Sequence, residues 1–156
     1  MPNHVHLILT PTDKNGLRDT LAEAHRQYTR FINEGHGWTG HLWQGRYGSA
    51  AMDEDHLESA VRYLSLNPLR AGLVNSAADW PWSSVRAHLA AEDDGLVIVR
   101  PVLDRFPDFA GMLEVEPTGA EMNALRRAET SGRPLGSKER VEELGVEMAK
   151  RQRKAR

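Results

Sequence analysis

The first ten residues constrain the fold more than any other part of the chain. The stretch HVHLILT is rich in apolar and β-branched residues and stops at Pro11, which is typical of a β-strand. Side chains of a strand alternate between its two faces, so His4 and His6 would share one face and Val5 would point the other way, into a core. A buried strand needs paired neighbours at its edges. The segment therefore predicts a sheet.

The remaining chain shows helical periodicity around one long loop. The loop is GHGWTGHLWQGRYGSA, which is rich in glycine and aromatic residues and has no helical period. The segment DWPWSSVRAHL indicates a turn that enters a short helix. Apolar spacing and capping residues predict longer helices over Leu17–Glu34, Asp53–Leu66, Gly119–Thr130 and Lys138–Lys150. We expect Asp53 to cap the second of these and Asn67–Pro68 to end it.

Composition excludes several classes of protein. The 156 residues include no cysteine, which rules out disulfides and thiolate chemistry. The 20 basic and 22 acidic residues give a net charge of −2, which is not the bulk charge of a nucleic-acid binder, although the last seven residues, KRQRKAR, are strongly basic. No apolar run approaches the roughly 18 residues of a membrane span, so we predict a cytoplasmic protein without a membrane partner.

Two histidines on one strand face can share a divalent ion. A site with two ligands needs a third protein group and open positions for substrate. Tyr63 and Asn67 lie four residues apart on a predicted helix and so share a face. Taken singly, the histidines could be two partly exposed side chains on a sheet and the tyrosine a core residue. The combination of metal-binding histidines, a tyrosine and an amide one turn later is more informative than its parts.

Four stretches in order carry a family resemblance: MPNHVHLIL, GHGWTGHLWQGRYGSA, AVRYLSLNPLRAGLV and DWPWSSVRAHL. The chain resembles the REP-associated tyrosine transposases, which are IS200-like members of the HUH (His-hydrophobic-His) class of single-strand DNA transposases. The resemblance runs from Met1 to about Leu89 and more loosely through RRAETSGRPLGS. It implies an α+β, ferredoxin-like (RRM-like) antiparallel sheet with helices on one face.

In the family, a strand and a helix precede the His-x-His strand, and the present sequence lacks them. We expect either a start assigned too far downstream or a decayed remnant of a mobile element, and we favour the former because no catalytic position is lost. The expected organisation is a truncated catalytic domain over residues 1–91 and a helical appendage with a basic tail over residues 92–156.

The resemblance also implies a site. It assigns the metal ligands to His4, His6 and Asn67, the ion to Mg²⁺ or Mn²⁺, and the nucleophile to Tyr63. Imidazole ligands alone would favour zinc or another transition metal. The tyrosine would attack a phosphate in single-stranded DNA, leaving a 5′-phosphotyrosine link and a free 3′-hydroxyl. Hairpin-forming repeats are the implied substrates.

The aromatic loop is a candidate DNA-binding surface. Bases stack on aromatic rings for about 1–3 kcal/mol each, and arginine and glutamine read base edges or bind phosphates. The candidate residues are Trp43, Gln44, Arg46 and Tyr47, with Arg62 beside the predicted nucleophile. Trp43 could instead anchor the loop by packing, and Tyr47 is the rival nucleophile.

Two other functions fit the same residues. One is an inactive remnant that only binds DNA hairpins, and the other is a metal-dependent hydrolase that uses His4 and His6 without Tyr63. A covalent adduct between the protein and single-stranded DNA would separate the transposase from both.

Overall fold

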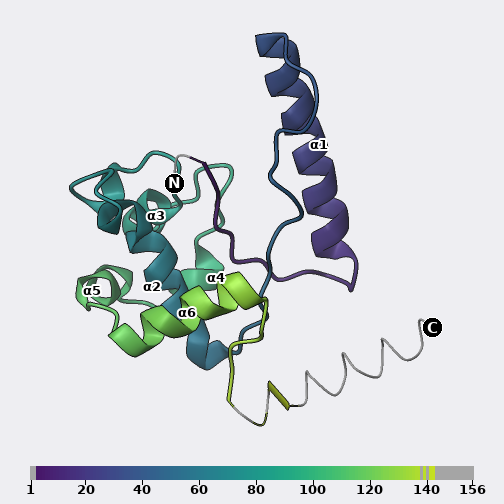
Figure 1. The fold of residues 1–156 in the computed structure, drawn as a ribbon. Helices are drawn as coiled ribbons and strands as arrows, with labels where there is room; N and C mark the ends of the chain where they lie inside the picture. The colour runs from purple at the N-terminus through teal and green to yellow at the C-terminus, as the bar shows by residue number, and fades with distance from the viewer. Residues whose placement is uncertain (1–2, 138, 140, 143–156) are drawn as a thin grey trace. The chain divides into compact units, whose positions relative to one another are not determined.

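The computed structural model describes residues 3–137, 139, 141 and 142, and Figure 1 traces the chain. The basic tail and most of the helix predicted over 138–150 lie outside the described residues. The chain divides into two compact units. The first unit combines residues 1–5 with residues 49–156, and the second unit consists of residues 6–48.

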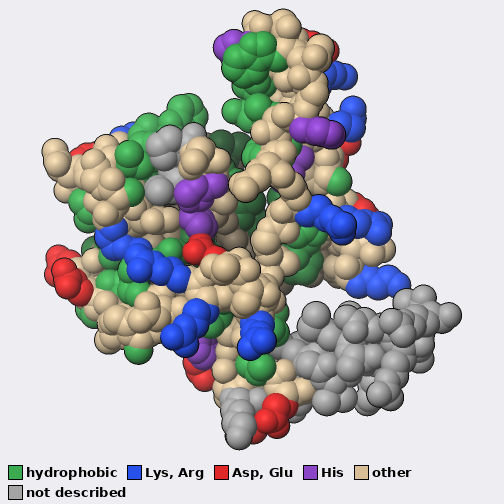
Figure 2. All heavy atoms as spheres, viewed as in Figure 1, with side chains coloured by type: hydrophobic (Ala, Val, Ile, Leu, Met, Phe, Trp, Pro, Cys, Tyr) green, Lys and Arg blue, Asp and Glu red, His purple; other side chains and the backbone are tan. Residues whose placement is uncertain are grey.

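The second unit is built on one long helix, α1 (Gly16–His36), which confirms the helix predicted there. Gly37 ends it in the left-handed conformation, with φ of 65°. None of its residues is buried, and Phe31 keeps 71% of its surface exposed. Hydrophobic side chains are visible on the surface of this unit in Figure 2. Neither α1 nor another helix of the described chain is both long and apolar enough to cross a membrane.

The predicted ferredoxin-like sheet is wrong. Residues 4–10 belong to no strand, and the part of the chain that the structure describes holds only an isolated parallel bridge between Met52 and Leu135. Val5 and Leu7, expected at a sheet, are 68% and 58% exposed. A strand is stable only when its backbone N–H and C=O groups are paired. No described segment pairs with residues 4–10, so their local β pattern does not produce a strand.

The first unit is organised around α2 (Glu54–Arg70), which confirms the second predicted helix. As predicted, Asp53 caps it, because its side chain accepts a hydrogen bond from the backbone N–H of His56. Its predicted end at Asn67–Pro68 is wrong. Pro68 lies in the last turn, and the chain leaves the helix at Gly72, where φ is 67°.

The geometry of this ending explains the extra turn. The Gly72 N–H donates to the Leu69 carbonyl at 2.9 Å, and the Leu73 N–H donates to the Pro68 carbonyl at 3.0 Å. This paired arrangement satisfies the last carbonyls of a helix and requires a left-handed residue, for which glycine is suited. The glycine therefore ends α2, rather than the proline.

Four short helices pack with α2 around one hydrophobic core. They are η1 (Ala77–Asp79), α3 (Val85–Ala90), α4 (Arg100–Leu103) and α5 (Phe109–Glu114). The short helix predicted after DWPWSS is thus confirmed as α3. The buried side chains of this core are Val61, Leu66, Ala77, Val85, Phe109 and Met112.

A second, smaller core joins α2 to α6 (Gly119–Ser131), the helix predicted over 119–130. Its buried members are Ala60, Tyr63 and Leu125. The N-terminus of α6 is fixed by a capping box, in which Thr118 and Glu121 satisfy each other's backbone N–H groups. This second core surrounds the tyrosine on which the functional prediction depends.

Candidate nucleophile and DNA-binding site

The candidate nucleophile and the candidate amide ligand lie on one face of α2. Tyr63 and Asn67 are four residues apart, so their side chains are neighbours along the helix surface. Tyr63 is only 6% exposed, whereas Asn67 is half-buried. The structure thus brings these two residues together and holds the tyrosine ring between α2 and α6.

Among the described residues, Glu129 and Arg70 bring charged groups to Tyr63 from different helices. Its hydroxyl lies 3.4 Å from Oε2 of Glu129, on α6, and donates to it. The guanidinium carbon of Arg70, one turn beyond Asn67 on α2, lies 4.5 Å from the centre of the tyrosine ring. A guanidinium over an aromatic face is attracted by the ring's negative face and also restricts its rotation. The phenol is therefore held by an acidic group at its oxygen and a basic group at its ring.

The two candidate metal-binding histidines have different surroundings. His4 is exposed, with its Nδ1 at 2.8 Å from Oδ1 of Asn3, and His6 is half-buried. The boundary between the two units falls between Val5 and His6, so the histidines belong to different units. Convergence of both imidazoles with Tyr63 stays a prediction.

The donor atoms of the predicted metal site suit a divalent ion. Two imidazole nitrogens and one amide oxygen, from His4, His6 and Asn67, would leave coordination positions open for a substrate oxygen. Within the described ranges, no three His, Asp or Glu side chains gather into a metal-binding group. The donor chemistry therefore fits, while Mg²⁺ or Mn²⁺ as the bound ion stays a prediction.

The aromatic loop is fastened to α1 by Trp43. Its indole Nε1–H donates to the backbone carbonyl of His25 at 3.2 Å, and its ring stacks on the His25 ring with the centroids 4.0 Å apart. Gln44 and Arg46, which follow, are exposed, and so is Tyr47. Trp43 thus anchors the loop on α1, and the Gln44, Arg46 and Tyr47 side chains that follow it are exposed to solvent.

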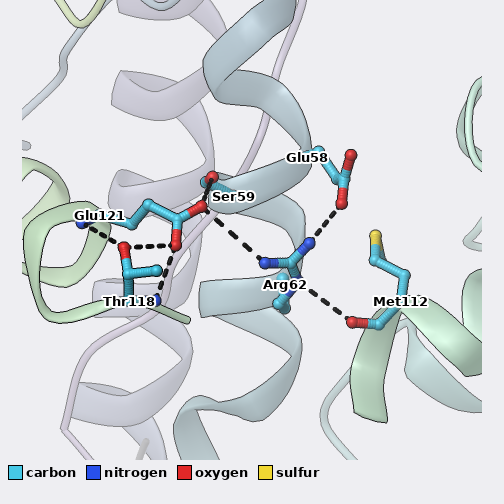
Figure 3. Close-up of polar contacts among 6 residues, drawn as sticks. All are labelled: Glu58, Ser59, Arg62, Met112, Thr118 and Glu121. Atoms are coloured by element: carbon cyan, nitrogen blue, oxygen red, sulfur yellow. Dashed lines mark hydrogen bonds and ion pairs between the residues drawn. The ribbon is translucent and has the colours of Figure 1, made fainter. Parts of the chain in front are cut away.

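Arg62 has a different environment from the other candidate DNA-binding residues. It is only 7% exposed, and its Nε–H donates to the Met112 carbonyl at 3.1 Å. Its terminal nitrogens pair with Glu58 and, at 3.9 Å, with Glu121 (Figure 3). The guanidinium of Arg62 is thus paired with groups from α2, α5 and α6, which supports a structural role. A DNA contact by Arg62 stays a prediction.

The carboxylates around α2 are strongly stabilised in their charged form. Hydrogen bonds from the Ser59 hydroxyl and from Thr118 lower the pKa of Glu121 to about 2. At the start of the helix, the hydrogen bond with the His56 side chain lowers the pKa of Asp53, with a smaller contribution from the Ser137 N–H. Both carboxylates connect α2 to later parts of the chain, Glu121 through Ser59 and Asp53 through the Ser137 N–H.

Sequence reasoning missed two residues of this site, Arg70 and Glu129. Arg70 lies seven residues after Tyr63, a spacing that returns to the same helix face, but the helix was expected to end before it. Glu129 belongs to RRAETSGRPLGS, a segment the resemblance covers loosely. Its position 66 residues from the tyrosine left no local signal that the two would meet.

Comparison with known proteins finds a family whose sequence model matches the N-terminal part of the chain and ends at Asn67. The family model described as IS200-like transposase matches residues 1–67, from the start of the chain through Asn67. Residues 1–67 are therefore similar in sequence to the IS200-like transposases. The family resemblance drawn from the four sequence stretches is thereby confirmed.

Two curated proteins resemble the IS200-like segment and the chain beyond it. One, from Haemophilus influenzae, carries the provisional name REP-associated tyrosine transposase and is 27% identical over 110 residues, covering 61% of this chain and 62% of the relative. The other, the REP-associated tyrosine transposase of Escherichia coli K12, is 24% identical over 91 residues, covering 58% and 53%. The chain thus matches little more than half of each relative's length. No solved structure matches the chain.

Proposed function

We propose that this chain is a tyrosine transposase that cleaves and rejoins single-stranded DNA. The observation that carries the proposal is the position of Tyr63 and Asn67 on one face of α2, at the end of the IS200-like segment. The names of the two curated relatives support the same chemistry.

In the proposed reaction, the Tyr63 phenol oxygen attacks a DNA phosphorus atom. A bond forms between that oxygen and phosphorus, the bond to the 3′-oxygen breaks, and the released strand ends in a 3′-hydroxyl after taking up a proton. The packing of Tyr63 against Leu125 and the guanidinium of Arg70 fix the ring, so that its oxygen is presented in one direction. Attack by another 3′-hydroxyl on the phosphotyrosine reverses the step and joins strands.

His4, His6 and Asn67 are the residues that would hold a divalent ion. Such an ion, when bound, would polarise the phosphate and stabilise the charge that develops on it. The neutral amide of Asn67 is the weakest of the three ligands, because water can replace an amide oxygen.

The aromatic loop is proposed to hold the DNA strand. Trp43 fixes the loop on α1, while Gln44 and Arg46 are exposed and able to donate hydrogen bonds to phosphates or base edges. Tyr47, 37% exposed, offers a ring on which a base can stack. We propose DNA hairpins with a single-stranded flank as the substrate class.

The deciding experiment is capture of the covalent intermediate. The purified chain is incubated with a labelled single-stranded DNA hairpin and Mg²⁺ or Mn²⁺, and the protein–DNA adduct is resolved on a denaturing gel. Tyr63→Phe removes one oxygen and keeps the ring, so the adduct should vanish while hairpin binding survives. Tyr47→Phe is the matched control and should still form the adduct. An adduct that depends on Tyr47 would reject Tyr63 as the nucleophile.

A second candidate function is supported by the burial of Tyr63. A ring that is 6% exposed suits a packing residue, and a protein that had lost cleavage could still use the exposed loop to bind hairpins. In that case the same experiment would show hairpin binding without an adduct in either the wild-type chain or Tyr63→Phe.

A further inference from the structure

A carboxylate from the C-terminal half of the chain meets the candidate nucleophile. Oε2 of Glu129 lies 3.4 Å from the Tyr63 hydroxyl, although the two residues are 66 positions apart. Ala60 and Leu125 pack on the ring, whereas Glu129 is exposed. The phenol ring is therefore buried, and its hydroxyl is directed toward a carboxylate at the surface.

Phenols need assistance to act as nucleophiles at neutral pH. A free phenol loses its proton only near pH 10, and a tyrosine that attacks phosphorus must lose that proton during the step. A carboxylate is ionised at neutral pH and can accept a proton that becomes more acidic as the new bond forms. The 3.4 Å separation is longer than the roughly 2.6–3.2 Å typical of a general base, and hydrogen bonds of this kind often tighten only when substrate binds.

Glu129 and Arg70, the charged groups that the described residues place at the phenol, have complementary roles. Glu129, on α6, faces the oxygen that must lose a proton, and Arg70, on α2, lies over the ring that gains negative charge as the proton leaves. A cation near a developing phenolate stabilises it. The pair thus suits activation of the phenol better than simple packing, for which neither charge is needed.

We propose that Glu129 accepts the phenolic proton of Tyr63 as the tyrosine attacks DNA. The proton passes from the Tyr63 oxygen to the Glu129 carboxylate, and the electron pair of the broken O–H bond forms the bond to phosphorus. The 3′-oxygen leaves with the electrons of the bond to phosphorus and takes a proton from water. This assignment rests on the proposed function, and it makes α6 a part of the active site.

The test measures the single-turnover rate of adduct formation against pH for the wild-type chain, Glu129→Gln and Glu129→Asp. At pH 7, Glu129→Gln should slow the step by about 10²–10⁴, the usual contribution of a general base. Its residual rate should rise steeply with pH, because without the carboxylate the proton must pass to hydroxide from the solvent, whereas the wild-type rate should depend far less on pH. Glu129→Asp should recover part of the rate, because it retains a carboxylate.

A more acidic nucleophile provides the second arm. Replacing Tyr63 by a ring-fluorinated tyrosine should restore much of the rate of Glu129→Gln and change the wild-type rate far less. Glu116→Gln, which neutralises an exposed carboxylate before α6, is the control and should behave as the wild type.

The outcomes separate this assignment from the function on which it rests. If the wild-type chain forms the adduct and Glu129→Gln loses the same factor at every pH, without rescue by the fluorinated tyrosine, Glu129 is not the proton acceptor and the transposase proposal stands. If the wild-type chain forms no adduct, the transposase proposal fails and this assignment fails with it.

Discussion

The Ser59 hydroxyl donates to Oε1 of Glu121 at 2.7 Å, linking the middle of α2 to the first turn of α6. The other oxygen of that carboxylate accepts from the backbone N–H of Thr118 at 2.7 Å and from its hydroxyl at 2.8 Å. A single carboxylate thus caps one helix and holds it against another. Since α6 packs on Tyr63, this link also positions the candidate active site.

The Glu121 link predicts a specific dependence of stability on pH. The pKa of Glu121 is lowered from 4.5 to about 2, so its contribution is complete above pH 4.5 and is lost as the pH falls toward 2. Because a third of the side chain is exposed, we expect a loss of only about 1–2 kcal/mol. Urea unfolding at pH 6, 4 and 3 measures it. In Glu121→Gln the free energy of unfolding should be lower at pH 6 and fall less on acidification.

The control for this prediction is Glu116→Gln, because Glu116 is exposed and lies just before the capped helix. Its stability should follow the wild-type pH profile. Parallel pH profiles for Glu121→Gln and the wild type would mean that Glu121 does not supply the acid sensitivity.

We expect Arg62 to increase the free energy of unfolding of the protein. Its guanidinium is buried among Glu58, Glu121 and the Met112 carbonyl, so Arg62→Ala removes a hydrogen bond to Met112 and the ion pairs with both carboxylates, although Glu121 keeps its bonds from Ser59 and Thr118. Breaking a buried ion pair costs about 3–5 kcal/mol, and partial exposure of both carboxylates should reduce this to about 2–3 kcal/mol. Arg62→Lys should recover little, because a single ammonium cannot span the same acceptors. Chemical denaturation measures the loss, and a stability within 0.5 kcal/mol of the wild type would contradict it.

We expect Arg46, unlike Arg62, to contribute to DNA binding and not to the free energy of unfolding. It is exposed in the aromatic loop, so Arg46→Ala should leave the free energy of unfolding unchanged within about 0.5 kcal/mol. It should weaken binding to a single-stranded hairpin and lower the slope of log affinity against log salt by about one, as expected for one lost phosphate contact. Fluorescence anisotropy at several salt concentrations tests this. Binding equal to the wild type throughout would assign Arg46 no DNA contact.

The three longest helices that the structure describes could be predicted from sequence, since the information for each is local. The 3.6-residue spacing of apolar side chains and the Asp53 cap gave α1, α2 and α6 within a few residues. The error at the end of α2 has a physical origin. Pro68 is tolerated in the last turn because Gly72 supplies the left-handed residue that satisfies the final carbonyls.

The absence of a sheet from the described residues could not be predicted in the same way. Alternating side chains in residues 4–10 describe a chain that could form a strand, but a strand also requires a partner, which local sequence does not specify. The environments of Tyr63 and Arg62 were missed for a related reason. The contacts of Tyr63 with Glu129, and of Arg62 with Met112, join residues 66 and 50 positions apart and follow from the packing of α5 and α6 on α2.

We expect Asp53 to contribute more to the free energy of unfolding than an ordinary helix cap does. Besides accepting from His56, its carboxylate accepts from the Ser137 backbone N–H at 3.0 Å, so it joins the start of α2 to the chain after α6. Loss of a cap costs about 0.5–2 kcal/mol, and we expect Asp53→Ala to lie at the upper end of this range. Asp53→Asn, which keeps an accepting oxygen, should lose less. Thermal and urea unfolding of both variants measure this difference, and equal losses would show that the carboxylate charge, rather than its geometry, is what stabilises the helix start.

The predicted metal site makes cleavage, but not folding, depend on a divalent ion. Chelation with EDTA should abolish adduct formation by the wild-type chain, and added Mg²⁺ or Mn²⁺ should restore it. His6→Ala should slow the step by at least about 10²-fold, since a Lewis acid supplies several kcal/mol of charge stabilisation. Asn67→Ala should be milder, because water can replace a neutral amide oxygen. His41→Ala removes an exposed histidine that is not a predicted metal ligand, and it should leave the dependence of adduct formation on the divalent ion unchanged. An adduct that forms equally in EDTA, with His6→Ala as fast as the wild type, would remove the ion and both histidines from the mechanism while leaving Tyr63 as a candidate nucleophile.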